Sequence, residues 1–207
     1  MLFSVSTANC SVMFYTDAAA FTAATTTTLI DFEGIAPDNG IDTPTNSKVV
    51  NSVTFTGVTG TLAIMGANAP YSGYPFDSAF LTQNNRVDRI DIDLSTAGTG
   101  FTAFGAIFGD QDSAGTTTTL RLLGLGGLLD TQNVIIGDTR SGQPKTFFGW
   151  TVDGADQIVG VEFDTAFDYG TIDDVRFGAA AVPEPTTLVL MGLGLAGIGF
   201  ARKKKQA

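Results

Sequence analysis

The 207-residue chain contains no histidine, and this absence removes several classes of active site at once. Ser-His-Asp and Cys-His nucleophiles, HExxH zinc sites and histidine proton shuttles all require an imidazole. The chain has one cysteine, Cys10, so it cannot form an internal disulfide bond. We therefore expect a protein that is not an enzyme, with a fold that holds together without covalent cross-links.

Basic residues are scarce until the end of the chain. Four of the 11 basic residues are Arg202, Lys203, Lys204 and Lys205. The chain before Pro183 carries 7 basic residues against 20 acidic ones, a net charge of -13. Such a body repels phosphate backbones, so we expect no nucleic-acid partner. It attracts cations, calcium above all.

Long apolar runs are also missing from the body, and ten short segments rich in Thr, Val, Ile and Phe stand in their place. Gly, Asp, Asn or Pro bounds each segment, as is typical of strands. Ile90, Ile92 and Leu94 alternate with acidic residues, which is the period of a half-buried strand. The ten predicted strands cover residues 28–34, 48–57, 60–66, 86–95, 101–110, 116–124, 133–138, 145–153, 156–165 and 171–178.

One short helix is predicted in the body, over residues 17–24, where Thr16 or Asp17 can cap a run of alanines. Strands that follow one another without helices indicate an all-β fold, an antiparallel β-sandwich of the jelly-roll kind. We expect the sandwich domain to cover residues 14–178. Its core is expected to include Trp150, Phe147 and Phe148.

Residues 1–13 allow two interpretations. The small residues Ala8, Asn9 and Cys10 are typical of the end of a signal peptide, but no basic region precedes them and the apolar run is short. The segment is either the remnant of a signal peptide truncated by a late start codon, or an ordinary N-terminus.

The end of the chain has a composition of its own. Residues 179–185 combine small residues with two prolines, which is typical of a short, partly stiff linker. Residues 186–201 carry no charge, and as a helix they would span about 24 Å, short of the roughly 30 Å hydrocarbon core of a bilayer. Because basic residues follow at once, the positive-inside rule favours a single transmembrane helix over 186–207 with its basic end in the cytoplasm.

The glycines of this tail also match a dinucleotide-binding pattern. GLGLAG at residues 192–197 fits GxGxxG. That motif needs a βαβ unit and an acidic residue about 20 positions further on, and the chain ends ten residues later. The glycines are therefore interpreted as small residues that allow membrane helices to approach closely.

Residues 182–205, VPEPTTLVLMGLGLAGIGFARKKK, closely resemble the PEP-CTERM sorting signal of bacterial surface proteins. The VPEP motif, the glycine-bearing apolar stretch and the basic end occur in the same order. The resemblance implies that an exosortase, a transpeptidase-like membrane protease, recognises Pro183, Glu184 and Pro185. It also implies an exported protein of a Gram-negative bacterium, anchored in the inner membrane by its C-terminal helix and then moved to the cell surface or the exopolysaccharide matrix.

The candidate metal site pairs Glu33 with Asp173 and, less directly, Asp174. By strand alternation Asp173 shares a face with Val175 and Phe177, so we expect it to point into the core, where a carboxylate needs a partner. The segments FEG and IDD are similar to the paired carboxylates of calcium-binding jelly rolls, including MAM-like and carbohydrate-binding modules. That similarity implies a structural Ca²⁺ at these residues. The alternative is that backbone N–H groups at strand ends bind the carboxylates.

The candidate ligand site is a loop rich in Gly and Pro at residues 69–78, which carries Tyr71, Tyr74 and Phe76. Aromatic faces on the loops of β-sandwiches stack on sugar rings. The alternative is that the three rings fold back over the end of the sandwich.

Three functions follow from these features. The first is an exported surface or matrix protein with a structural or adhesive, non-catalytic body. The second is a carbohydrate-binding module with a polysaccharide partner. The third is a glycoside hydrolase, which would need two carboxylates about 5–9.5 Å apart.

Overall fold

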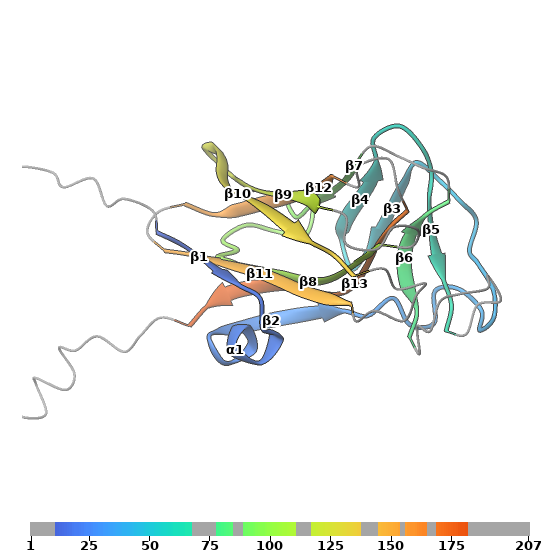
Figure 1. Ribbon diagram of the computed structural model, residues 1–207, viewed down its shortest axis with the longest axis horizontal. Helices are drawn as coiled ribbons and strands as arrows, with labels where there is room; N and C mark the ends of the chain where they lie inside the picture. The colour runs from blue at the N-terminus through green and yellow to red at the C-terminus, as the bar shows by residue number, and fades with distance from the viewer. Residues whose placement is uncertain are drawn as a thin grey trace, which may run out of the picture.

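The computed structural model describes residues 11–67, 78–84, 89–110, 117–137, 145–153, 156–164 and 169–181. Two antiparallel sheets face each other across these segments, with one short helix against the outer face of one sheet (Figure 1). The predicted all-β sandwich with a short N-terminal helix is confirmed. The predicted transmembrane helix over 186–207 lies outside the described residues.

Thirteen strands and one helix make up the described part of the chain. The helix is α1 (Ala18–Ala23), and the strands are β1 (Val12–Tyr15), β2 (Thr25–Ile30), β3 (Ser47–Val50), β4 (Val53–Gly57), β5 (Leu62–Met65), β6 (Phe80–Gln83), β7 (Arg89–Asp93), β8 (Ala103–Asp110), β9 (Thr117–Gly124), β10 (Gly127–Ile135), β11 (Thr146–Val152), β12 (Ile158–Asp164) and β13 (Gly170–Ala180). The larger sheet has the order β1-β11-β8-β13-β6-β5, with β2 also paired to β13, and the smaller sheet has the order β10-β9-β12-β7-β4-β3.

The main core fills the space between the two sheets and is rich in aromatic rings. Phe108 of the larger sheet and Phe163 of the smaller sheet meet edge-on, with ring centroids 5.1 Å apart. Trp150 is fully buried, and Phe148 belongs to the same cluster. These residues confirm the core position predicted for Trp150 and Phe148. Such ring pairs add to the free energy that burial of their apolar area already supplies.

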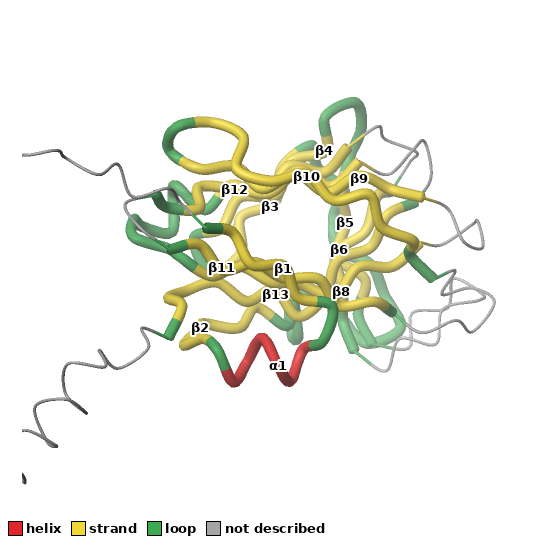
Figure 2. Tube along the Cα trace, turned by 60° about the vertical axis from the view of Figure 1, so that its left-hand side comes forward, coloured by secondary structure: helices red, strands yellow, loops and turns green. Residues whose placement is uncertain are grey.

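Helix α1 covers the outer face of the larger sheet (Figure 2). Asp17 is its N-cap, and its Oδ1 accepts a hydrogen bond of 2.6 Å from the backbone N–H of Ala20, as expected for a capping carboxylate. Phe21 is buried beneath the helix against Phe147, with ring centroids 5.3 Å apart. Phe147 is therefore buried as predicted, but in a second cluster on the opposite face of the sheet from Trp150.

Strand β13 holds the larger sheet together. It pairs with β8 along one edge, while its other edge pairs with β6 at Thr171 and Ile172 and with β2 from Val175 onward. The register with β8 shifts between Asp173 and Arg176, so two residues of β13 lie opposite one residue of β8. This is a β-bulge, and Asp174 within it has a positive φ of 50°.

Several strand boundaries differ from the prediction. Residues 48–57, predicted as one strand, form the hairpin β3–β4, because Asn51 and Ser52 adopt positive φ values in a tight turn. Strands β1 and β6 were not predicted, and β10 begins at Gly127 rather than at residue 133. The sandwich also begins at Val12, inside the segment 1–13 that we expected to precede it, and β13 continues to Ala180.

The bulge makes a prediction about Asp174, which is a non-glycine residue in left-handed backbone. We expect Asp174→Val to lower the free energy of unfolding by about 1–3 kcal/mol, because a β-branched side chain is strained at positive φ. We expect Asp174→Gly to change it little, since glycine adopts this conformation without strain. Denaturant unfolding of the full chain, followed by circular dichroism, measures both. An equal loss in the two variants would instead assign the effect to the carboxylate.

Candidate functional site

Asp173 is buried, with 3% of its surface exposed, but it lies on the face opposite to the predicted one. Ile172 pairs with Phe108 in the main core, whereas Asp173 pairs with Ile107, which packs on the second cluster outside the sheet. Val175 lies in the main core again. The prediction that Asp173 shares a face with Val175 is therefore wrong, because the bulge interrupts the alternation on which it depended.

The carboxylate of Asp173 accepts hydrogen bonds from three groups. Its Oδ2 accepts hydrogen bonds from Ser78 Oγ at 2.8 Å and from Lys145 Nζ at 3.2 Å, and its Oδ1 accepts one of 2.8 Å from the N–H of Asp174. Burial raises the pKa of Asp173 above its ordinary value, and the Ser78 hydroxyl and the Lys145 ammonium oppose that rise. Lys145 supplies the partner that the sequence did not identify.

Glu33 binds the residue next to Ser78. Its Oε1 accepts a hydrogen bond of 2.8 Å from the N–H of Ala79. The two carboxylates that the sequence paired, Glu33 and Asp173, thus hold two successive residues, Ser78 and Ala79. Asp174 does not join them, because its Oδ2 lies 3.3 Å from Nη2 of Arg176.

This arrangement fits a calcium ion poorly. Among the described residues, no three His, Cys, Asp or Glu side chains come close enough to one another to hold a metal ion. The ammonium of Lys145 lies beside Asp173 and repels a divalent cation. Backbone N–H groups bind Glu33 and Asp173, as in the alternative that the sequence left open. Calcium binding stays a prediction.

The other predicted site residues lie outside the described residues. They are the aromatic residues Tyr71, Tyr74 and Phe76, the motif residues Pro183, Glu184 and Pro185, and the basic residues Arg202, Lys203, Lys204 and Lys205. In the segments that are described, no helix is long and apolar enough to cross a membrane.

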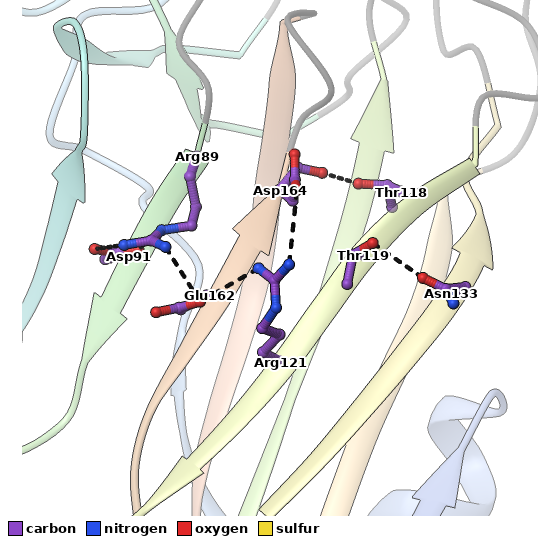
Figure 3. Close-up of polar contacts among 8 residues, drawn as sticks. All are labelled: Arg89, Asp91, Thr118, Thr119, Arg121, Asn133, Glu162 and Asp164. Atoms are coloured by element: carbon purple, nitrogen blue, oxygen red, sulfur yellow. Dashed lines mark hydrogen bonds and ion pairs between the residues drawn. The ribbon is translucent and has the colours of Figure 1, made fainter. Parts of the chain in front are cut away.

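A row of charged side chains, which was not predicted from the sequence, crosses the outer face of the smaller sheet (Figure 3). Arg89 Nε binds Asp91 Oδ1 at 2.6 Å, and its Nη1 lies 3.3 Å from Oε2 of Glu162. Arg121 Nη1 lies 3.4 Å from the same oxygen and its Nη2 lies 4.0 Å from Asp164 Oδ2. The row therefore alternates in sign across strands β7, β12 and β9.

These side chains form a network rather than a set of free charges. The hydrogen bond from Arg89 to Asp91 raises the pKa of Arg89, against the opposing effect of its burial. Thr119 and Asn133 extend the polar face, with Thr119 Oγ1 3.0 Å from Asn133 Oδ1. The signal in the sequence was strand alternation, which directs these side chains away from the core, but cross-strand pairing could not be read from one strand at a time.

Comparison with known proteins identifies the end of the chain. Residues 181–204 match the family model described as the PEP-CTERM protein-sorting motif. The chain carries a PEP-CTERM sorting motif. This motif confirms the resemblance found in the sequence, and it marks an exported protein that an exosortase sorts to the cell surface.

The body is similar in fold to two carbohydrate-binding modules of known structure. One is TmCBM61 in complex with β-1,4-galactotriose, with 15% identity, a TM-score of 0.37, and coverage of 61% of this chain and 88% of that chain. The other is the C-terminal family 22 carbohydrate-binding module of Clostridium thermocellum Xyn10B, with 20% identity, a TM-score of 0.37, and coverage of 72% and 99%. No curated protein matches the chain.

The position of Lys145 makes a testable prediction about pH. The folded pKa of Asp173 is raised, so its contribution to stability is complete below its unfolded pKa and is lost as the pH rises through the folded pKa. Lys145→Met removes the ammonium that stabilises the ionised form of Asp173, so more stability is lost when Asp173 ionises. We expect the variant to be less stable by about 1–3 kcal/mol at pH 7, and by less at pH 4.

Denaturant unfolding of the full chain at the two pH values measures this difference. In a chain that already carries Asp173→Asn, the loss of stability caused by Lys145→Met should be the same at pH 7 and pH 4. A loss of equal size at both pH values would mean that Lys145 stabilises the fold through the packing of its aliphatic stem. The same measurement with millimolar calcium tests the metal prediction, since a calcium site requires a stabilisation that Glu33→Ala and Asp173→Ala both remove.

Proposed function

We propose that this protein is a structural or adhesive component of the cell surface or exopolysaccharide matrix of a Gram-negative bacterium, and that its sandwich is not catalytic. The observation that carries the proposal is the sorting motif at residues 181–204. The motif begins at Ala181, directly after the last residue of β13. The folded body and the sorting signal are therefore contiguous in the chain.

The order of events follows from the chemistry of the tail. The uncharged residues 186–201 hold the exported chain in the inner membrane, and the basic end stays in the cytoplasm because positive residues are retained there. The exosortase then recognises Pro183, Glu184 and Pro185 on the outer side of the membrane and separates the body from the tail. This chain is the substrate of that reaction.

A non-catalytic body is supported by how its charged groups are used. The chain has no histidine, the most common general acid and base at neutral pH. The buried carboxylate of Asp173 is bound by Lys145 and Ser78. The carboxylates of Glu162 and Asp164 lie in the row of ion pairs on the smaller sheet. These groups stabilise structure in the arrangement seen here.

Carbohydrate binding is the second candidate function, and a glycoside hydrolase is the third. The position of the tail relative to the sandwich supports carbohydrate binding. Strands β5 and β6, which the segment with Tyr71, Tyr74 and Phe76 connects, lie at the right of Figure 1, on the side opposite to the end of β13. A body held by its C-terminus would present that end to the surrounding polysaccharide.

Exosortase processing makes the first prediction of this function. In a host that expresses the enzyme, we expect the native chain to lose its tail and leave the membrane. We expect Glu184→Ala combined with Pro185→Ala to accumulate at full mass in the membrane fraction, because the recognition element is changed. Intact-mass spectrometry of the membrane and extracellular fractions measures both. Gln206→Ala, beyond the basic residues, is the matched control and should be processed as the native chain is.

Carbohydrate binding makes a second prediction. We expect Tyr71→Ala, Tyr74→Ala and Phe76→Ala each to weaken binding to the host exopolysaccharide about two- to tenfold, since a lost aromatic contact costs about 0.5–1.5 kcal/mol. Affinity electrophoresis of the full chain in detergent measures the change. Met13→Ala, an exposed apolar residue on β1, should bind as the native chain does. Native binding that none of the three variants weakens would exclude this loop as the site.

A further inference from the structure

The tip of the β9–β10 hairpin is apolar and exposed. Leu125 has 67% and Leu128 has 60% of its surface exposed, and glycines at 124, 126 and 127 surround them. Gly124 pairs with Gly127 across the turn, and Gly127 has a φ of 112°, which only glycine adopts readily. Two large apolar side chains thus stand on a narrow turn, where they contribute little to the core.

This tip lies at the same end of the sandwich as the end of β13. The N–H of Ala180 donates to Thr102 Oγ1 at 2.9 Å, and the carbonyl of the preceding residue, Phe101, accepts a hydrogen bond of 2.7 Å from the N–H of Ile158. Gln157 in turn accepts one of 3.2 Å from the N–H of Leu125. Figure 1 shows the hairpin and the end of β13 at its left-hand end, which comes forward in Figure 2.

The short connection to the tail keeps the hairpin end of the sandwich close to the anchor of residues 186–201. Only residues 182–185 separate Ala181 from the uncharged stretch, and four fully extended residues span at most about 14 Å. A body anchored by that stretch therefore lies with its hairpin end toward the bilayer surface. Acidic residues at this end are already hydrogen-bonded, Asp153 to the N–H of Ser11 and Asp156 to that of Gln157.

We propose that Leu125 and Leu128 dock the body on the lipid surface while the tail is still attached. The proposal rests on the membrane anchoring given above. A two-residue contact is weak by itself, but the tail makes it intramolecular, so the high effective concentration of lipid compensates for its small area. The contact is apolar, since the body carries a net negative charge and gains nothing from anionic lipids. The contact holds the end of the sandwich opposite to the hairpin away from the membrane.

Tryptophan fluorescence in vesicles tests this contact. The full chain with Leu128→Trp is inserted into phosphatidylcholine vesicles that contain spin-labelled lipid, and Ile135→Trp is the matched control. Ile135 lies on the same strand with 65% of its surface exposed, seven residues further along, or about 24 Å at the rise of a strand. We expect quenching of the Leu128→Trp signal to be several-fold greater than that of Ile135→Trp. The buried Trp150 gives the same background in both.

Flotation of the same vesicles separates the failure of this proposal from that of the anchor. If both chains float with the vesicles and their quenching is equal or absent, the docking proposal is overturned while membrane anchoring stands. If neither chain floats, anchoring fails and the docking proposal fails with it. Leu125→Trp repeats the measurement at the other tip residue in case Leu128→Trp does not fold, which near-ultraviolet circular dichroism reports.

Discussion

The β-bulge in β13 is the constraint on which the larger sheet and its candidate site depend. A strand of 11 residues has β8 on one edge but two partners, β6 and β2, on the other. The extra residue of the bulge falls between the segments that pair with β6 and with β2, where a regular ladder would have to continue with one partner. It also turns Asp173 to the outer face, since a one-residue insertion reverses the faces of the residues on one side of it. The contacts of Asp173 with Ser78 and Lys145 follow from that reversal.

A second consequence concerns the direction of the body. β13 runs from Gly170 at one end of the larger sheet, past Asp173, to Ala180 at the other, and the sorting motif begins at the next residue. Any ligand binding at the end of the sandwich opposite to Ala180 must therefore be compatible with attachment of the chain through its C-terminus. If the tail anchors the protein as proposed, the position of the tail, rather than the fold class, decides which end of the sandwich faces outward.

The sequence could predict those features that depend on local pattern. Alternation located most strands, Asp17 and the alanines after it predicted α1, and the rings of Trp150 and Phe148 predicted the core. β6 was missed because all four of its residues are buried, so it shows no alternation. The bulge was missed because an aspartate, rather than a glycine, occupies its left-handed position. Glu33 and Asp173, which the sequence paired as a metal site, bind the successive residues Ala79 and Ser78, and these contacts depend on tertiary structure that the sequence pattern does not contain.

The two open sides of the sandwich are each closed by a carboxylate, in a chain that has no disulfide to do so. Asp130 of β10 accepts a hydrogen bond of 2.8 Å from the indole N–H of Trp150 in β11, which joins the two sheets. On the other side Asp42 accepts one of 2.7 Å from the N–H of Ile64 in β5 and pairs with Lys48 in β3. These two carboxylates therefore link neighbouring elements at the two sides of the sandwich through polar contacts.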